Sequence, residues 1–71
     1  MTILTALRKI DTLTPCELRH CIQRMDTELK HYERVVLHYD AYHMIRFGIP
    51  YKRHLEKQRQ AFVDKLNEKE Q

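Results

Sequence analysis

The chain has 71 residues, 42% of them apolar and 32% charged, and carries a formal net charge of +3 with its five histidines counted as neutral. A chain of this length builds one small domain with a limited core, so we expect a single domain over residues 1–71. One glycine and two prolines are too few for the many turns of an all-β fold, and they favour a small number of long helices.

A short amphipathic helix is the first predicted element, over residues 2–10. Its apolar positions recur at helical spacing; they are Ile3, Leu4, Leu7 and Ile10. A sharper signal follows, because Thr14 can cap a helix, Pro15 suits the first helical position and Glu17 can complete a capping box. The sequence therefore predicts that a second helix begins at residue 15.

An unbroken apolar stripe runs along this second helix. Its members are Leu18, Ile22, Met25, Leu29, Tyr32, Val36 and Tyr39. The intervals alternate between four and three residues, which keeps the side chains on one seam and is typical of coiled coils. The stripe predicts a helix that packs along a partner helix.

The end of the long helix is predicted at Gly48. Nothing before Phe47 breaks a helix strongly, so the predicted helix spans residues 15–47, Gly48 is its left-handed stop and Pro50 begins the next helix. The last helix, residues 50–69, carries its own apolar face; its members are Tyr51, Leu55, Phe62 and Leu66. We thus expect an all-α fold, a short helix followed by an antiparallel helical hairpin, as a small bundle that oligomerisation could complete.

The predicted helix lengths differ. Residues 15–47 would form a helix of about 50 Å, and residues 50–69 one of about 30 Å. The seam near Leu18, Ile22 and Met25 would then stay uncovered by the hairpin. Residues 2–10 could fold over it, another chain could cover it, or the long helix could break near residues 29–32.

Binding to another protein is the function that this seam favours. We expect a regulator, adaptor, inhibitor or co-chaperone that also self-associates as a homodimer or other homo-oligomer. Tyrosine is enriched where surfaces are buried against partners, although the same rings could close the hairpin core. The predicted partner-binding residues are Leu18, Ile22, Met25, Tyr32, Val36 and Tyr39.

Nucleic-acid binding is the alternative function. Basic side chains gather near Tyr51 at the start of the last predicted helix, and such clusters can contact phosphates. They are Lys52, Arg53, Lys57 and Arg59. Acidic residues share that helix, so a solvated basic face is the competing interpretation.

Catalysis, cofactors and metals receive little support. The sequence has no glycine-rich phosphate loop and no nucleophile with a base and an orienting group, so we expect neither an enzyme nor a cofactor. Cys16 and His20 have the spacing of two metal ligands, but a zinc site needs three or four, so we expect no metal.

An intracellular, reducing compartment is the expected location. On one helix, Cys16 and Cys21 point roughly 140° apart and cannot form a disulfide, and free thiols suit the cytoplasm. We read no signal peptide at the N-terminus. No apolar run approaches the roughly 18 residues of a membrane span, so we expect no membrane partner.

Overall fold

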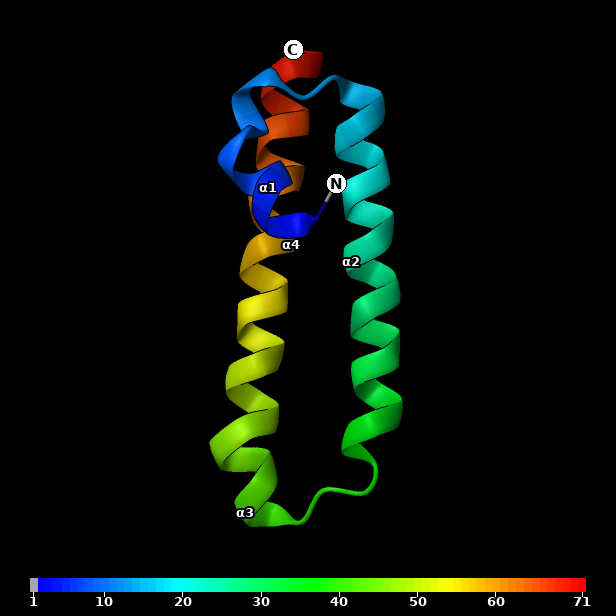
Figure 1. The fold of residues 1–71 in the computed structure, drawn as a ribbon, viewed down its shortest axis with the longest axis vertical. Helices are drawn as coiled ribbons and strands as arrows, with labels where there is room; N and C mark the ends of the chain where they lie inside the picture. Colours follow the sequence, from blue (N-terminus) through cyan, green and yellow to red (C-terminus); the bar gives the residue numbers. More distant parts are fainter. Residues whose placement is uncertain (1) are drawn as a thin grey trace.

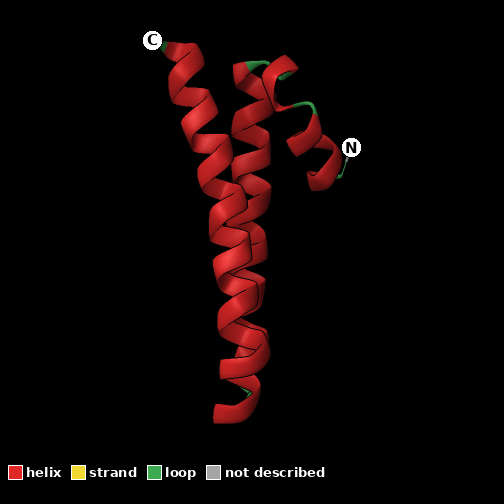
Figure 2. Cartoon of the chain, turned by 90° about the vertical axis from the view of Figure 1, so that its left-hand side faces the viewer, coloured by secondary structure: helices red, strands yellow, loops and turns green. Residues whose placement is uncertain are grey.

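The computed structural model describes residues 2–71, and all of its regular elements are helical (Figure 1). In chain order they are α1 (Ile3–Arg8), the 3₁₀ turn η1 (Ile10–Thr12), α2 (Pro15–Val36), α3 (Ala41–His43), the π-helical segment η2 (Met44–Gly48) and α4 (Ile49–Glu70). The long elements form an antiparallel hairpin, and α1 lies on one face of its upper half (Figures 1 and 2). The predicted all-α helical hairpin is confirmed.

The start of α2 is the one that the sequence predicts. The Thr14 side chain accepts a hydrogen bond from the Glu17 backbone N–H at 3.2 Å, and the Glu17 carboxylate accepts one from the Thr14 backbone N–H at 3.1 Å. This reciprocal pair satisfies two backbone donors that the first turn of a helix leaves free. Hydrogen bonding from the Thr14 backbone and side chain lowers the pKa of the Glu17 carboxyl.

The predicted position of the hairpin turn is wrong. The second helix ends at Val36 rather than Phe47, and the chain reverses over residues 37–40. Gly48 has φ −64° and ψ −57°, which are right-handed helical angles, so it is not a left-handed stop. The helical backbone continues from Ala41 to Glu70 through the sites where we predicted a stop at residue 48 and a new helix at residue 50.

Two local features explain the observed turn. Val35 and Val36 are β-branched residues with reduced helix propensity at the end of α2, and Asp40 caps the helix that follows. The Asp40 side chain accepts a hydrogen bond from the His43 backbone N–H at 2.9 Å. Within η2 the backbone N–H of Ile49 bonds to the carbonyl of Met44, five residues earlier. This wider turn carries the helix past Pro50, which lacks the N–H that a regular helix would use there.

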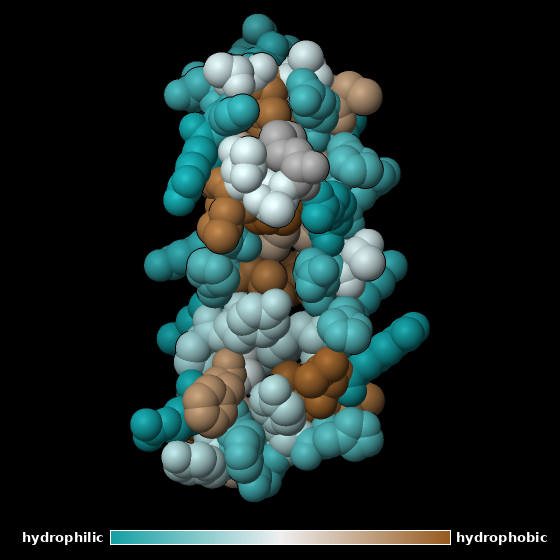
Figure 3. Space-filling model, in the orientation of Figure 1, coloured by the Kyte–Doolittle hydropathy of each residue, from teal (hydrophilic) through white to brown (hydrophobic). Residues whose placement is uncertain are grey.

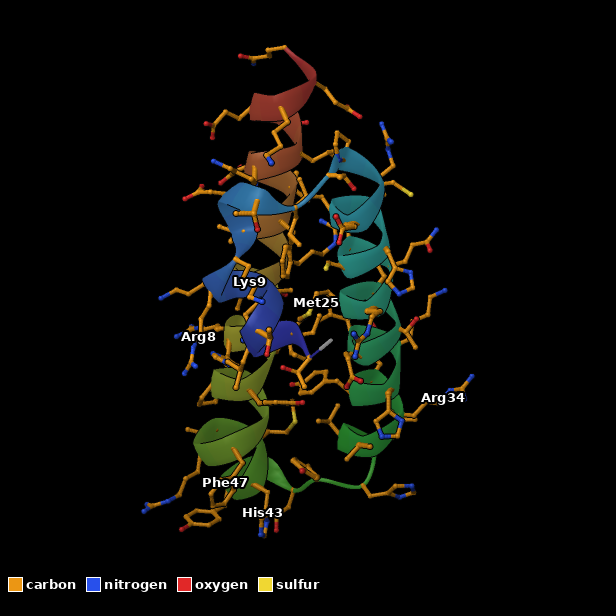
Figure 4. The ribbon with its side chains drawn as sticks, turned by 45° about the horizontal axis from the view of Figure 1, so that its top comes forward. Arg8, Lys9, Met25, Arg34, His43 and Phe47 are labelled. Atoms are coloured by element: carbon orange, nitrogen blue, oxygen red, sulfur yellow. The ribbon has the colours of Figure 1, made fainter. Side chains whose placement is uncertain are left out.

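The core lies between α2 and α4 and is closed by α1 at its upper end. Its fully or nearly fully buried residues are Ala6, Leu13, Leu18, Cys21, Met25, Tyr32, Leu55 and Phe62. In Figure 4, Met25 points into the space between the two long helices, whereas Arg34 points away from them. Both cysteines are free thiols, Cys16 exposed and Cys21 buried, and burial raises the pKa of the Cys21 thiol.

Polar contacts fasten the upper end and the middle of the hairpin. The Lys65 ammonium lies 2.6 Å from the Asp11 carboxylate, and Lys69 donates to the backbone carbonyl of Asp11 at 2.8 Å. Halfway down, Arg59 Nε donates to Asp26 at 2.7 Å. These contacts tie η1 and α2 to α4. Among residues 2–71, no such contact between the two arms is found at the turn end, near residue 40.

The observed arms remove the predicted length mismatch. The arm of residues 41–70 is longer than α2, about 45 Å against about 33 Å, and it therefore spans the whole seam. Ile3, Leu7 and Ile10 pack against the same core, so residues 2–10 do fold over it, which was one of the three arrangements left open. No helix within residues 2–71 has the length and apolar character to cross a membrane.

Candidate partner-binding surface

The six predicted partner-binding residues separate into two groups along α2. Leu18 and Met25 are buried in the core beneath α1 and α4, and Ile22 is half-buried beside them. The early turn places α4 over this part of α2, so these three side chains pack within the chain. Their burial is supplied within one chain.

The other three line an open groove at the turn end. Tyr32 is buried, Val36 is half-buried and Tyr39 is exposed, and together they form part of the wall of this groove, whose volume is about 580 Å³. Phe47, Gly48, Pro50 and Tyr51 contribute the wall from the second arm, with Glu28, His31, Val35 and Arg46 also lining it. The lower part of the predicted seam is therefore accessible, and the upper part is not.

The surrounding segment, residues 35–51, differs in composition from the rest of the chain. We call it the hairpin end. Asp40 and Arg46 are its only charged residues, and it contains no lysine or glutamate, although 32% of the whole chain is charged. Aromatic residues, methionine and arginine are enriched at the centres of protein interfaces, where lysine and glutamate are depleted. The hairpin end has this interface composition.

Large apolar side chains are exposed throughout the hairpin end. Leu37 is 80% exposed, Ile45 70% and Phe47 52%. The others that reach the surface are Val35, Tyr39, Tyr42, Ile49 and Tyr51. Figure 4 shows Phe47 and His43 at this end of the molecule, and brown and tan hydrophobic residues reach the surface in the lower part of Figure 3.

Ring contacts organise this surface around His43. Its ring lies 5.4 Å from that of Tyr42 in an edge-on arrangement, and 6.1 Å from those of Tyr39 and Phe47. His43 Nδ1 also lies 2.7 Å from the Asp40 carboxylate. The hydrogen bonds from the His43 backbone and ring lower the pKa of the Asp40 carboxyl, so the cap stays ionised at neutral pH.

One buried polar atom lies beneath the groove. Tyr32 is 6% exposed, and its hydroxyl has no hydrogen-bond partner among residues 2–71. The chain passes close by, since a Cβ atom at Gly48 would lie 3.4 Å from this hydroxyl and 2.8 Å from Met44 Sδ. Gly48 therefore serves close packing of the two arms rather than a change of chain direction.

We expect the substitution Tyr32→Phe to leave the free energy of unfolding unchanged or to raise it by about 1 kcal/mol. A buried hydroxyl without a partner loses its hydration and gains nothing in return, and phenylalanine keeps the ring that contacts Tyr51 at 6.1 Å. Urea unfolding followed by circular dichroism measures the change, with the exposed Tyr42→Phe as control. A loss of stability confined to Tyr32→Phe would mean that the hydroxyl is hydrogen-bonded.

The four predicted nucleic-acid-binding residues do not form one free basic cluster. Arg59 is paired with Asp26, and Lys52 lies 3.9 Å from Glu56. Arg53 and Lys57 are exposed, with no ion pair recorded among the described residues. Two of the four side chains are thus free to contact phosphates.

The exposure of Phe47 and Ile45 was not predicted from the sequence. Their exposure depends on the turn at residues 37–40, whereas the predicted turn placed them inside the long helix. The signal that could have found them is the nearly uncharged run over residues 35–51. Nowhere in residues 2–71 do three or more histidine, cysteine, aspartate or glutamate side chains gather as a metal site would require.

Comparisons with known proteins add no relative to this description. No protein family model, curated protein or solved structure matches the chain.

Proposed function

We propose that this chain is a small helical protein–protein interaction module and that it binds its partner through the hairpin end, residues 35–51. The observation that carries the proposal is a groove of about 580 Å³ whose wall includes the exposed side chains of Val35, Tyr39, Phe47 and Tyr51. Exposed apolar patches mark interaction sites and ligand-binding grooves on proteins. The module acts by presenting this surface at the end of the hairpin that α2 and α4 form.

The composition of the surface supports a protein rather than a nucleic acid as the partner. Phosphate backbones are bound by lysine and arginine, but the hairpin end holds Arg46 as its single basic residue apart from histidines. Tyrosine and arginine are the residues most often found as binding hot spots between proteins. Tyr39, Tyr51 and Arg46 line the groove itself.

The test compares proteins captured from the native host by the wild-type chain and by the double variant Phe47→Ser, Tyr51→Ser. We expect capture of a specific protein that the variant loses and that the matched variant Lys57→Ser, Asp64→Ser retains. Circular dichroism checks that both variants keep their helices. Identical capture by all three chains would contradict a role for the hairpin end.

Nucleic-acid binding remains the second candidate, supported by the exposed Arg53 and Lys57. The two candidates respond differently to salt, because each phosphate contact releases counterions and an apolar contact does not. Binding that falls steeply with salt, and that is lost on Arg53→Gln, Lys57→Gln, would favour the nucleic acid. Binding that survives high salt favours the hairpin end.

A further inference from the structure

The hairpin end is the part of the surface best suited to meet a copy of itself. Its two charged residues, Asp40 and Arg46, have opposite signs and cancel, so the net charge of +3 belongs to the remainder of the chain. Two copies that approach through other surfaces bring like net charges together, which disfavours contact. Two copies that approach through their hairpin ends bring together segments whose formal net charge is zero.

The exposed apolar area that lines the groove suits a weak, reversible dimer. Four of the exposed apolar side chains of the hairpin end belong to the groove wall; they are Val35, Tyr39, Phe47 and Tyr51, 38–52% exposed. At roughly 150–200 Å² per side chain, these four present on the order of 300 Å². A standard interface buries about 800 Å² on each partner, so a contact through this groove is smaller than the standard size.

The hairpin end carries both a concave apolar wall and exposed aromatic rings that could pack against such a wall. The groove offers a concave apolar wall, to which Tyr32 and Val36 contribute from α2. Phe47 and Tyr51, about half exposed, belong to the same surface and offer aromatic rings to fill such a wall. A two-fold contact needs both properties on one patch, since the same residues meet on both subunits.

We infer that the occupant of the groove is a second copy of this chain. The two hairpin ends pack against each other about a two-fold axis, and each places Phe47 and Tyr51 against the groove of the other. This inference rests on the proposed function, because it names the partner that the hairpin end binds. It leaves the two upper ends, with α1 and the chain termini, outside the contact.

The test is sedimentation equilibrium of the full chain from low to high micromolar concentration, at low and high salt. We expect a reversible dimer whose dissociation constant changes little with salt. Phe47→Ser and Tyr51→Ser should each weaken the dimer about tenfold or more, as truncation of an aromatic hot spot does. Cys16→Ser is the control, because Cys16 is exposed and lies at the start of α2, at the far end of the hairpin, so it should leave the dimer unchanged.

Three results would overturn the inference. The first is a wild-type chain that is monomeric at high micromolar concentration. The second is a dimer that Cys16→Ser weakens while Phe47→Ser does not. The third is a monomer that sediments with phosphatidylcholine–phosphatidylglycerol vesicles. A monomer that still captures another protein in a Phe47-dependent manner would overturn the self-contact and leave the proposed function standing. A monomer without such capture would remove both. Helicity measured for every variant separates loss of contact from loss of fold.

Discussion

Replacement of Leu18 by alanine is expected to lower the free energy of unfolding by about 2–5 kcal/mol, which is the usual cost of removing a large apolar side chain from a core. Leu18 is 0% exposed and belongs to the buried core. A core of this size supplies only about 3–5 kcal/mol of net stability, so a large fraction of the variant should be unfolded at room temperature.

Leu4→Ala is the matched control for this result. It removes the same atoms from a side chain that is 63% exposed, and surface substitutions usually change stability by less than about 0.5 kcal/mol. Urea unfolding followed by far-ultraviolet circular dichroism, at a protein concentration low enough to keep the chain monomeric, measures both variants. If both lost stability equally, or if Leu18→Ala behaved as wild type, the placement of Leu18 in an intramolecular core would be wrong.

The sequence predicted the contents of this core better than its partner surface. The alternating stripe on α2 identified Leu18, Met25 and Tyr32 as positions that must be buried, because helical periodicity depends only on the chain itself. What buries them depends on where the chain turns back. The same stripe fits an intermolecular seam and an intramolecular one, and only the observed turn at residues 37–40 distinguishes them.

The turn was mispredicted because the strongest local breakers lie elsewhere. Gly48 and Pro50 are the most common signals for a helix end, whereas Asp40 is an ordinary helix-capping residue that also occurs within helices. Tertiary packing decides in favour of Asp40, since a turn there lets the second arm cover all of α2. The π-helical segment η2 lets the helical backbone continue through Gly48 and Pro50. Residue propensities do not predict a wider turn of this kind.

The candidate surface was only half predictable for the same reason. Tyr39 was expected at an interface from its place on the stripe, and it lines the groove. Phe47 and Ile45 were expected within a long helix, and their exposure follows from their position next to the true turn. Composition carried the missing information, because the absence of lysine and glutamate over residues 35–51 does not depend on knowing the fold.

Replacement of Pro50 by alanine is expected to raise the free energy of unfolding by roughly 1–2 kcal/mol. Proline in a helix interior is about 3 kcal/mol less favourable than alanine, and the wider turn of η2 already relieves part of this cost. The substitution restores a backbone N–H inside the helical run from Ala41 to Glu70.

The other proline of the chain is the control. Pro15 occupies the first turn of α2, where no N–H is needed and the fixed φ angle favours the helix, so Pro15→Ala should lower stability by about 0.4–1 kcal/mol. The two changes are thus expected to have opposite signs in urea unfolding at a monomeric concentration. If the hairpin instead turned at Gly48–Pro50, Pro50 would begin a helix as Pro15 does, and both substitutions would lower stability. The sign of the Pro50→Ala change therefore decides between the two positions of the turn, and with it whether the aromatic hairpin end is a turn surface or the middle of a long helix.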